Sequence, residues 1–403
     1  MSQKLPVVIA GAGPTGLMCA LALAREGVKV VVCEAEPTLT HDLRAGSFHP
    51  PTQEMMAPYG ITDQMHAHGG LQVRTWQVRS RRGGLVAEFD LGLLADVTPY
   101  PYRLHLEQHR LTPIMLDLLR HETNAEVHFG HRITGFEPRP HSVLVQFESE
   151  GIPGKLEAAW LIGADGGRST IRKLLQVEFE GFTWPEQFLV VSTPYDLGRH
   201  GFAMNAYVAD PEEWAAVFKM PDQGPPGLWR LAFPCAPGLP DDALLDPKAV
   251  QKRMQGFQPL DSEYEIRYQS IYRVHQRVAS EWRKGRVLLA GDAAHLNNPL
   301  GGFGLNSGIH DAVNLAAKLA RVWRDEHHEA LLDLYVHQRR KATIDQVQAM
   351  SIRNKRLLEE RDPAVQKARM EELIATAADP QRARDYLLET SMIAGLKRSR
   401  ETS

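Results

Sequence analysis

The chain begins with two short apolar runs separated by residues at helical spacing. Residues 5–10 and 28–33 are almost wholly apolar and rich in β-branched side chains, as is typical of parallel strands that are buried on both faces. Between them, apolar side chains in 17–24 recur at the spacing of one face of a helix. This pattern predicts a βαβ unit of about 30 residues.

Farther along, the pattern changes to alternation of apolar and polar residues, which is typical of half-exposed antiparallel strands. The alternating stretches are 71–78, 85–91, 142–148, 188–195, 201–209, 214–220, 228–234 and 264–272. Residues 158–163 and 286–290 return to the wholly apolar pattern, and residues 108–121 have helical spacing. The chain after about residue 304 is expected to be helical.

We therefore predict a combined α/β and α+β architecture. A Rossmann-like dinucleotide-binding domain carries an inserted, mostly antiparallel sheet domain for the substrate, and a helical C-terminus follows. The predicted boundaries are 1–70, 104–178 and 276–345 for the first domain, 71–103 and 179–275 for the second, and 346–403 for the C-terminal segment. Because the two domains are interleaved along the chain, we expect a shared crevice, where ligands usually bind.

Composition narrows the possible functions. The chain has 403 residues and a formal net charge of −3, which gives no basis for general binding to nucleic acid. Its three cysteines are too few for a disulfide framework and have no metal-ligand spacing, so we expect no metal site. No apolar run reaches the roughly 18 residues of a membrane span. The N-terminus leads directly into a predicted strand, so we expect no leader peptide and a cytoplasmic protein.

The turn of the predicted βαβ unit has the pattern Gly-x-Gly-x-x-Gly at Gly11, Gly13 and Gly16. In a dinucleotide-binding unit the first glycine allows the tight turn, the second lets a pyrophosphate approach the backbone, and the third lets helix and strand pack closely. The N-terminus of the following helix then faces the pyrophosphate with its positive end. Glu34, at the end of the second strand, can accept hydrogen bonds from both hydroxyls of a ribose. A glycine-rich turn without a ligand is the alternative interpretation.

Two further loops follow predicted buried strands. One is Gly163-Ala164-Asp165-Gly166, and the other is GDAAHLNNPLGGFGLNSG at 291–308. In the second loop, Asp292 is placed to accept a hydrogen bond from a sugar-like hydroxyl, and a simple helix N-cap is its alternative role. The proline and glycines of 299–304 would bring backbone amides toward a planar, electron-rich ring and stabilise negative charge on it.

Taken together, several segments resemble the single-component FAD-dependent aromatic hydroxylases, the superfamily of para-hydroxybenzoate hydroxylase. These segments are GAGPTG with Glu34, Arg44, Gln108, IGADGGRSTIRK and RVLLAGDAAHLNNPLGGFGLNSG. Residues 271–279 are similar to the branch that acts on phenols, phenylpropionates and polyketide phenols. The resemblance covers most of residues 1–345 and implies an FAD-binding domain of the glutathione-reductase type.

The resemblance implies roles around FAD for individual residues. The residues implied to bind the pyrophosphate are Gly11, Gly13, Pro14, Thr15 and Gly16, and the residue implied to bind the adenosine ribose is Glu34. Contacts to ribose and phosphates are implied for Arg44 and Gln108, and contacts to FAD and the nicotinamide nucleotide for Asp165 and Gly166. Asp292 matches the ribityl-binding aspartate, and the residues implied around the flavin ring are Pro299, Gly301, Gly304, Leu305 and Asn306.

The resemblance also implies an NAD(P)H- and O2-dependent monooxygenase. NADH or NADPH binds transiently and reduces FAD, and oxygen then forms a flavin C4a-hydroperoxide that transfers one oxygen atom to a phenolic ring. The same scaffold could catalyse epoxidation, oxidative denitration or dehalogenation of a phenol, or oxygenation that inactivates a drug. An FAD-binding redox sensor without an organic substrate and a plain NAD-linked dehydrogenase are further alternatives. A flavin halogenase is disfavoured because the chain has no Trp-x-Trp sequence.

The sequence gives less information about which residues activate or contact the substrate. His49 is the candidate catalytic base because it follows a segment expected beside the flavin, with a structural histidine as the alternative. His295 belongs to the flavin motif itself, so a structural or flavin-adjacent role is favoured for it.

Contacts to a small aromatic substrate are predicted for four residues of the sheet domain. These are Tyr195, Tyr207, Trp229 and Arg230, with Trp214 and Phe218 as further candidates. Arg230 could anchor a carboxylate with two hydrogen bonds, or it could be a solvated strand residue. Each aromatic residue could instead belong to the core. The expected assembly is a monomer or a homodimer.

Overall fold

The computed structural model describes residues 4–41, 46–325 and 328–401. One large sheet has six strands and contains the wholly apolar runs of the sequence. In spatial order the strands are β18 (Arg283–Lys284), β19 (Val287–Leu289), β12 (Trp160–Gly163), β1 (Val7–Ala10), β2 (Val30–Cys33) and β8 (Ala125–His128). The strands from β19 to β8 are parallel, and β18 is antiparallel to β19.

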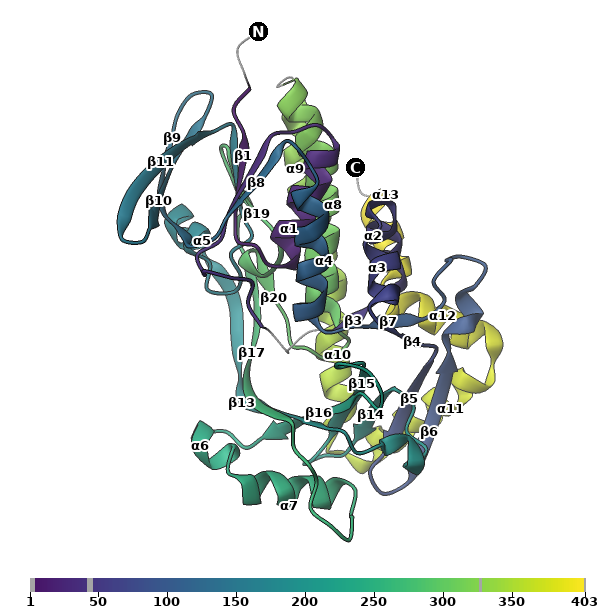
Figure 1. Ribbon diagram of the computed structural model, residues 1–403. Helices are drawn as coiled ribbons and strands as arrows, with labels where there is room; N and C mark the ends of the chain where they lie inside the picture. The colour runs from purple at the N-terminus through teal and green to yellow at the C-terminus, as the bar shows by residue number, and fades with distance from the viewer. Residues whose placement is uncertain (1–3, 42–45, 326–327, 402–403) are drawn as a thin grey trace.

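Helices cover one face of this sheet, and a small antiparallel sheet covers the other (Figure 1). The helices are α1 (Pro14–Arg25), α4 (Gln108–Arg120) and α8 (Phe303–Arg324), with α9 (Ala330–Ala342) packed against α8. The small sheet consists of β9 (His131–Pro138), β10 (Val143–Ser149) and β11 (Ile152–Ala158), and α5 (Thr170–Leu175) lies beside it. Burial on both faces is the reason why β1, β2, β12 and β19 are apolar throughout, whereas the edge strand β8 is partly exposed and contains Glu126 and His128.

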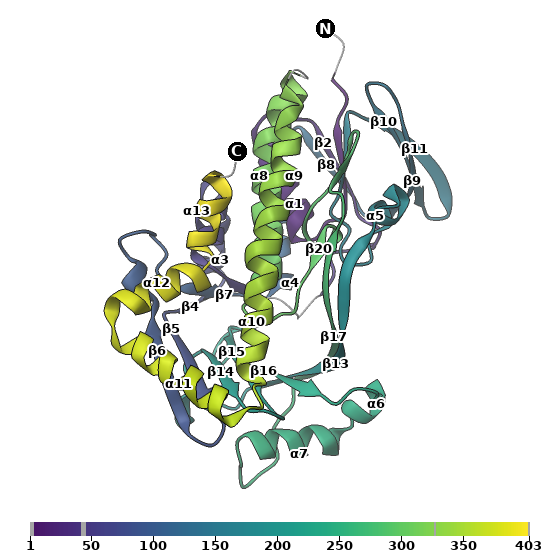
Figure 2. The same ribbon diagram turned by 180° about the vertical axis from the view of Figure 1, so that it is seen from behind.

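Most of the alternating stretches form an eight-stranded sheet at the other end of the molecule (Figures 1 and 2), whereas 142–148 forms β10 of the small sheet and 71–73 lies in a separate three-stranded sheet. Its order is β20 (His295–Leu296), β17 (Tyr268–Ala279), β13 (Phe179–Thr193), β16 (Leu228–Cys235), β15 (Ala215–Met220), β14 (Asn205–Ala209), β5 (Thr75–Ser80) and β6 (Gly84–Asp90). Neighbouring strands are antiparallel except for β14 and β5. The predicted fold class, with a mostly antiparallel inserted sheet, is confirmed.

Different helices cover the two faces of the eight-stranded sheet. On β14, Ala206 and Val208 pack in one hydrophobic cluster with α7 (Pro247–Phe257), whereas Tyr207 and Ala209 pack in another with the C-terminal helices. The C-terminal helices are α10 (Ala349–Leu358), α11 (Pro363–Ala378) and α12 (Pro380–Thr390), which Figure 2 shows across this face. A π-helical turn, η6 (Thr343–Gln348), joins α9 to α10, α13 (Ile393–Glu401) returns to α9, and the short α6 (Asp241–Leu244) precedes α7. The predicted helical C-terminus is thus confirmed.

A three-stranded sheet lies between the two large sheets (Figure 1). It consists of β3 (Ser47–Phe48), β7 (Arg103–His105) and β4 (Leu71–Val73), and α2 (Pro50–Met56) and α3 (Ile61–Ala67) follow β3. The predicted domain boundary between residues 103 and 104 falls inside β7, and the division into domains stays a prediction. Within the described residues, no helix has both the length and the apolar composition needed to cross a membrane.

Candidate active site

The first glycine loop connects β1 to α1, and no side chain caps the N-terminus of α1, which begins at Pro14. A Cβ at Gly11 would lie 2.6 Å from the carbonyl oxygen of Ala164, and a Cβ at Gly16 would lie 2.0 Å from that of Gly11, so neither position can hold a larger residue. A Cβ at Gly13 would meet nothing within 4 Å. Gly13 therefore faces open space in front of unpaired helical amides, an arrangement that fits a phosphate group.

Glu34 lies beside this loop, directly after β2. Its Oε2 accepts a hydrogen bond from the backbone N–H of Ala12 at 2.6 Å, and its Oε1 accepts one from that of Glu36 at 2.9 Å. The carboxylate therefore ties the glycine loop to the end of β2. Because a carboxylate has about four lone-pair positions, Glu34 keeps acceptor capacity for ribose hydroxyls.

The second loop follows β12 and lies against the first. A Cβ at Gly11 would be 3.1 Å from the Cα of Asp165. The Asp165 carboxylate accepts hydrogen bonds from Ser169 Oγ at 2.5 Å and from the backbone N–H of Thr170 at 2.7 Å, so it holds the N-terminus of α5. The implied contact of this loop with FAD would thus be left to its backbone, where Gly166 faces open space.

Thr15 links the first and third glycine loops. A Cβ at Gly291 would lie 2.5 Å from Thr15 Oγ1, and a Cβ at Gly308 would lie 2.4 Å from it. Helix α1, helix α8 and the short 3-10 turn η4 (Gly291–Ala293) therefore close around this one side chain. Thr15, implied to contact the pyrophosphate, also sets the spacing of the loops.

A buried ion pair supports the third loop from α8. Asp311 accepts hydrogen bonds from the backbone N–H of Gly291 at 3.0 Å, from His295 Nε2 at 2.8 Å and from Arg339 Nε at 2.7 Å. Burial alone would raise the pKa of Asp311, but Arg339 and His295 together lower it below its ordinary value. The ionised carboxylate thus supports the start of the loop, and His295 is engaged in the same network.

His49 and Asn306 hold the glycine-rich part of the third loop against the start of α2. Asn306 Oδ1 accepts a hydrogen bond from the backbone N–H of His49 at 2.9 Å. Asn306 Nδ2 donates to the carbonyl oxygens of Ser47 and Gly302 at 2.8 and 2.5 Å. His49 Nε2 donates to the carbonyl oxygen of Gly301 at 2.8 Å. These bonds fix the loop that is implied to surround the flavin ring.

His49 is wholly buried and uncharged. Burial lowers its pKa well below the ordinary value, and the Arg103 cation lowers it further. Since Nε2 donates to Gly301, the neutral ring presents an unprotonated Nδ1, which has no hydrogen-bond partner. The ring stacks on Phe303 with centroids 5.5 Å apart. The geometry therefore offers a hydrogen-bond acceptor beside the loop, as a general base requires.

The other residues implied to contact FAD lie around the same loops. Gln108 is the first residue of α4, and Asp292 lies in η4 with an exposed side chain. The third loop and the first turn of α8 contain Pro299, Gly304 and Leu305. Arg44 lies outside the described residues. The roles of all these residues toward FAD stay predictions.

Tyr207, on β14, reaches the third loop from the eight-stranded sheet. Burial raises the pKa of Tyr207 to about 12, although Arg103 and the backbone of Gly301 act in the opposite direction. Its hydroxyl makes no hydrogen bond of ordinary geometry. The ring lies edge-on to Trp76 at 5.9 Å. Gly301 is therefore approached both by His49 and by Tyr207.

Three residues of this region were not predicted from the sequence, namely Arg103, His105 and Asn205. Arg103 and His105 are two positions apart on β7, and Asn205 and Tyr207 are two positions apart on β14, so each pair shares a face of its strand. All four residues are buried. A polar–apolar–polar triplet within a short buried strand is the signal that could have found them.

Tyr195 and Trp229, two of the predicted substrate residues, are not brought to this site. Both side chains pack in the hydrophobic cluster on the α7 side of the sheet, and both hydrogen-bond within 196–200. Arg230, the next residue on β16, is buried on the other face, where its charge acts on His105. Alternation along the strand explains why neighbouring residues were separated.

The comparisons with known proteins agree with this geometry. The model of the FAD binding domain family matches residues 4–350. The chain is 34% identical over 397 residues to the para-nitrophenol 4-monooxygenase of Pseudomonas sp. (strain WBC-3), with 96% of each chain covered. The chain belongs to the FAD-dependent aromatic monooxygenases.

Further relatives of this monooxygenase support the assignment. It is 34% identical over 365 residues to the 6-hydroxy-3-succinoylpyridine 3-monooxygenase HspB of Pseudomonas putida (strain DSM 28022 / S16), covering 90% of this chain and 91% of that protein. The crystal structure of p-nitrophenol 4-monooxygenase PnpA from Pseudomonas putida DLL-E4 matches with a TM-score of 0.91 and 32% identity, covering 98% and 99% of the two chains. The crystal structure of a ternary complex of aklavinone-11 hydroxylase with FAD and aklavinone matches with a TM-score of 0.77 and 27% sequence identity, covering 89% of this chain and 70% of that chain. FAD as the cofactor is confirmed.

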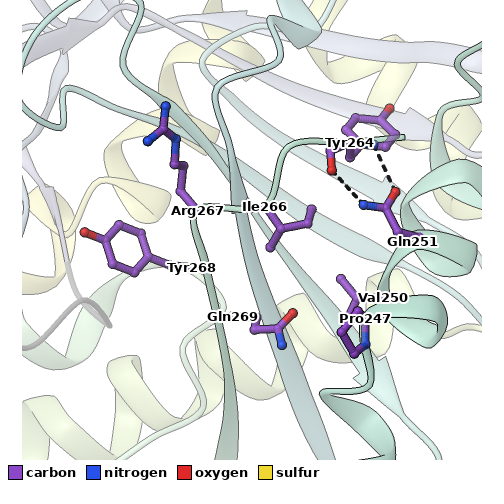
Figure 3. A pocket seen from close by; sticks show the side chains of 8 residues that line it. All are labelled: Pro247, Val250, Gln251, Tyr264, Ile266, Arg267, Tyr268 and Gln269. Carbon is purple, nitrogen blue, oxygen red and sulfur yellow. Dashed lines mark hydrogen bonds between the residues drawn. The ribbon is translucent and has the colours of Figure 1, made fainter. Parts of the chain in front are cut away.

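A surface hollow of about 400 Å³ lies elsewhere in this monooxygenase (Figure 3). It is lined by α7 and by residues at the start of β17. Gln251 Nε2 donates to the carbonyl oxygen of Tyr264 at 2.6 Å, and the backbone N–H of Tyr264 donates back to Gln251 Oε1 at 2.9 Å. Because α7 covers the face of the sheet opposite to Tyr207, the hollow is separate from the candidate active site.

Proposed function

We propose that this monooxygenase uses NADH or NADPH and O2 to hydroxylate a single phenolic or hydroxypyridine ring. The position of Gly301 carries the proposal, because His49 donates to its carbonyl oxygen while Tyr207 of the eight-stranded sheet approaches the same residue. A ring bound between the sheets would lie against the loop implied to hold the flavin. The names of the two relatives above, a nitrophenol and a hydroxypyridine monooxygenase, support a hydroxylated single ring.

The described residues fit FAD. The uncapped N-terminus of α1 and the open space at Gly13 suit its pyrophosphate, and Glu34 has acceptor capacity for its ribose. The N-terminus of α8, where Gly302 is the N-cap, likewise has no side-chain cap. Its first amides would stabilise negative charge on a ring bound there. When bound, FAD accepts a hydride and activates oxygen.

The chain itself would activate and shelter the substrate. His49 Nδ1 can accept a hydrogen bond from a substrate hydroxyl, which increases electron density on the ring. Trp76, Phe89 and Tyr386 stack with centroids 4.6 to 5.6 Å apart on the face covered by the C-terminal helices. Such an apolar wall excludes water, which favours oxygen transfer over release of hydrogen peroxide.

Oxidative denitration is the second candidate function. It is favoured by the two para-nitrophenol monooxygenases, one curated and one solved, that this chain matches over nearly its full length. In that reaction the attacked ring carbon would bear a nitro group, and nitrite would leave.

The test is oxidation of NADH and of NADPH by the FAD-loaded protein in the presence of nitrophenols, hydroxybenzoates, other phenols and hydroxypyridines. Hydrogen peroxide, nitrite and product mass are measured in the same samples. We expect one class to accelerate oxidation many-fold and to gain one oxygen with little peroxide, and release of nitrite would select the second candidate. If turnover ended only as peroxide with every compound, the proposal would be wrong.

A further inference from the structure

Arg103 is a buried cation without an acidic partner among the described residues. The residue is 5% exposed, and its Nε has no hydrogen-bond partner. Its guanidinium makes one long hydrogen bond, 3.4 Å from Nη2 to the carbonyl oxygen of Thr390, within the described part of the chain. Removing a cation from water is strongly unfavourable unless an anion or several acceptors compensate it.

Two other buried cations of the chain show the usual compensation. Arg339 Nε donates to Asp311 Oδ1 at 2.7 Å, and the Lys355 ammonium pairs with the carboxylate of Glu186. Arg103 therefore differs from them in having an unused charge, which suggests that its partner is a ligand.

The polar side chains nearest to Arg103 also lack partners. Arg103 and His105 share one face of β7, and the charge of Arg103 acts on the pKa values of His105 and Tyr207. The His105 ring is 6.2 Å from that of Phe218, which is directly opposite Asn205 in the sheet. His105 Nε2 and both amide atoms of Asn205 have no hydrogen-bond partner, and the hydroxyl of Tyr207 makes no hydrogen bond of ordinary geometry. We call Arg103, His105, Asn205 and Tyr207 the polar cluster.

The groups around Arg103 supply no negative charge at neutral pH. Burial lowers the pKa of His105 to about 4 and that of His49 well below its ordinary value, so both rings are neutral. Burial raises the pKa of Tyr207 to about 12, and it also raises the pKa of Tyr386. Both phenols are therefore protonated at neutral pH. The polar cluster is thus positively charged, and it contains hydrogen-bond donors that an oxyanion could use.

The polar cluster lies beside the loop implied to hold the flavin. Tyr207 approaches the backbone of Gly301, and the carbonyl oxygen of Thr390 places the end of α12 against Arg103. An aromatic ring at Gly301 with an oxyanion on its edge would bring that group to the guanidinium.

We propose that Arg103 binds an oxyanion carried by the aromatic substrate, with Tyr207 and Asn205 donating hydrogen bonds to the same group. The inference rests on the proposed function, because that function places the ring beside Gly301. The oxyanion is either a phenolate oxygen or a carboxylate on the ring, and a guanidinium pairs with both.

The test is equilibrium binding to the FAD-loaded full chain without NADH or NADPH, followed by flavin fluorescence. For the phenolate, 4-nitrophenol above its solution pKa is compared with 4-nitroanisole, and for the carboxylate, 4-hydroxybenzoate is compared with 4-hydroxybenzamide. We expect the wild type to prefer the anion of one pair, and Arg103→Met to weaken that anion about 100-fold while changing the neutral analogue little. Arg103→Lys should retain part of the preference.

Controls separate this role from a structural one. Lys355→Met removes a buried cation that already has a carboxylate partner, so the preference for the anion should stay. The melting temperature of ligand-free Arg103→Met should equal or exceed that of the wild type, since an uncompensated buried charge is removed.

Three results would overturn the inference. They are a wild type that does not prefer either anion over its neutral analogue, an Arg103→Met variant that keeps the preference, and an equal loss of charged and neutral ligands. Because binding is measured without turnover, a protein that binds an anion through Arg103 and never oxygenates it would contradict the proposed function alone.

Discussion

Buried histidines determine much of the chemistry available at the scale of single residues. His49, His105 and His310 are all buried, and burial is the main cause that lowers each pKa, to about 4 for His105 and to about 3 for His310. At neutral pH these rings are uncharged, so each has one nitrogen that donates and one that accepts. The candidate base at His49 is therefore an acceptor because of where the fold places it.

The buried histidines should make the fold less stable as the pH falls below about 6.5. The unfolded state takes up a proton near that pH, whereas folded His310 stays neutral down to about pH 3. The unfolded state then binds more protons, which lowers the free energy of unfolding by up to about 1.4 kcal/mol per pH unit for each such histidine. Urea unfolding from about pH 7 to about pH 4.5 measures this. His310→Gln should show a shallower decline, and an unchanged decline would contradict the assignment.

Gly13→Ala should weaken FAD binding without unfolding the protein. The added Cβ meets no protein atom within 4 Å and would project into the space in front of α1, where the pyrophosphate is predicted. We expect the affinity for FAD to fall about 10- to 100-fold, because a phosphate loses close contact with unpaired amides. Fluorescence titration of the apoprotein measures the affinity, and thermal unfolding of the apoprotein is the control. Unchanged affinity would show that the pyrophosphate does not bind at Gly13.

At the scale of elements, the packing of α1 on α8 depends on one threonine and two glycines. Thr15 occupies the space that a side chain at Gly291 or Gly308 would need. The first and third glycine loops are almost 300 residues apart in the sequence. They meet because they follow β1 and β19, two parallel strands of one sheet that are separated only by β12.

Gly308→Ala should lower the free energy of unfolding by about 1–3 kcal/mol, because its Cβ would lie 2.4 Å from Thr15 Oγ1. Thr15→Ala removes that oxygen and leaves the Thr15 Cβ 3.7 Å from the new methyl group. The double variant should therefore be more stable than the sum of the single effects implies. Denaturant unfolding of the four proteins measures the coupling, and strict additivity would show that the clash is relieved elsewhere.

At the scale of the whole molecule, the C-terminal helices complete the wall of the candidate active site. Tyr386 of α12 stacks on Phe89 of β6 at 4.6 Å and on Trp76 of β5 at 5.6 Å. The end of the chain therefore covers a sheet whose first strands come from near residue 75, as Figure 2 shows.

Tyr386→Ala should raise the fraction of NADH or NADPH oxidation that ends as hydrogen peroxide. Loss of the ring would open the apolar wall to water, and a wet site favours release of hydrogen peroxide over oxygen transfer. The ratio of peroxide to oxygenated product measures the effect. Tyr386→Phe keeps the stacked ring and should keep the wild-type ratio, so equal ratios in all three proteins would show that α12 does not shelter the reaction.

The elements of the fold were predictable from local patterns. Wholly apolar runs indicated β1, β2, β12 and β19, because a strand between two layers has no face that tolerates polar residues. Period-two alternation indicated the large antiparallel sheet for the complementary reason. The glycine loops could also be predicted, because the close approach of backbone segments leaves no room for a larger residue at Gly11 and Gly16.

The substrate side was decided by tertiary structure. Alternation predicts that neighbouring residues on a strand face opposite sides of the sheet, but it does not say which side meets the flavin loop. The sequence alone therefore could not decide whether Trp229 or Arg230 faces the candidate active site. Arg103 and Tyr207 interact although β7 and β14 lie in different sheets and are about 100 residues apart in the chain. The sequence by itself thus determined the elements and the cofactor loops through local spacing, whereas the polar cluster arose from pairing between distant strands, which no local pattern encodes.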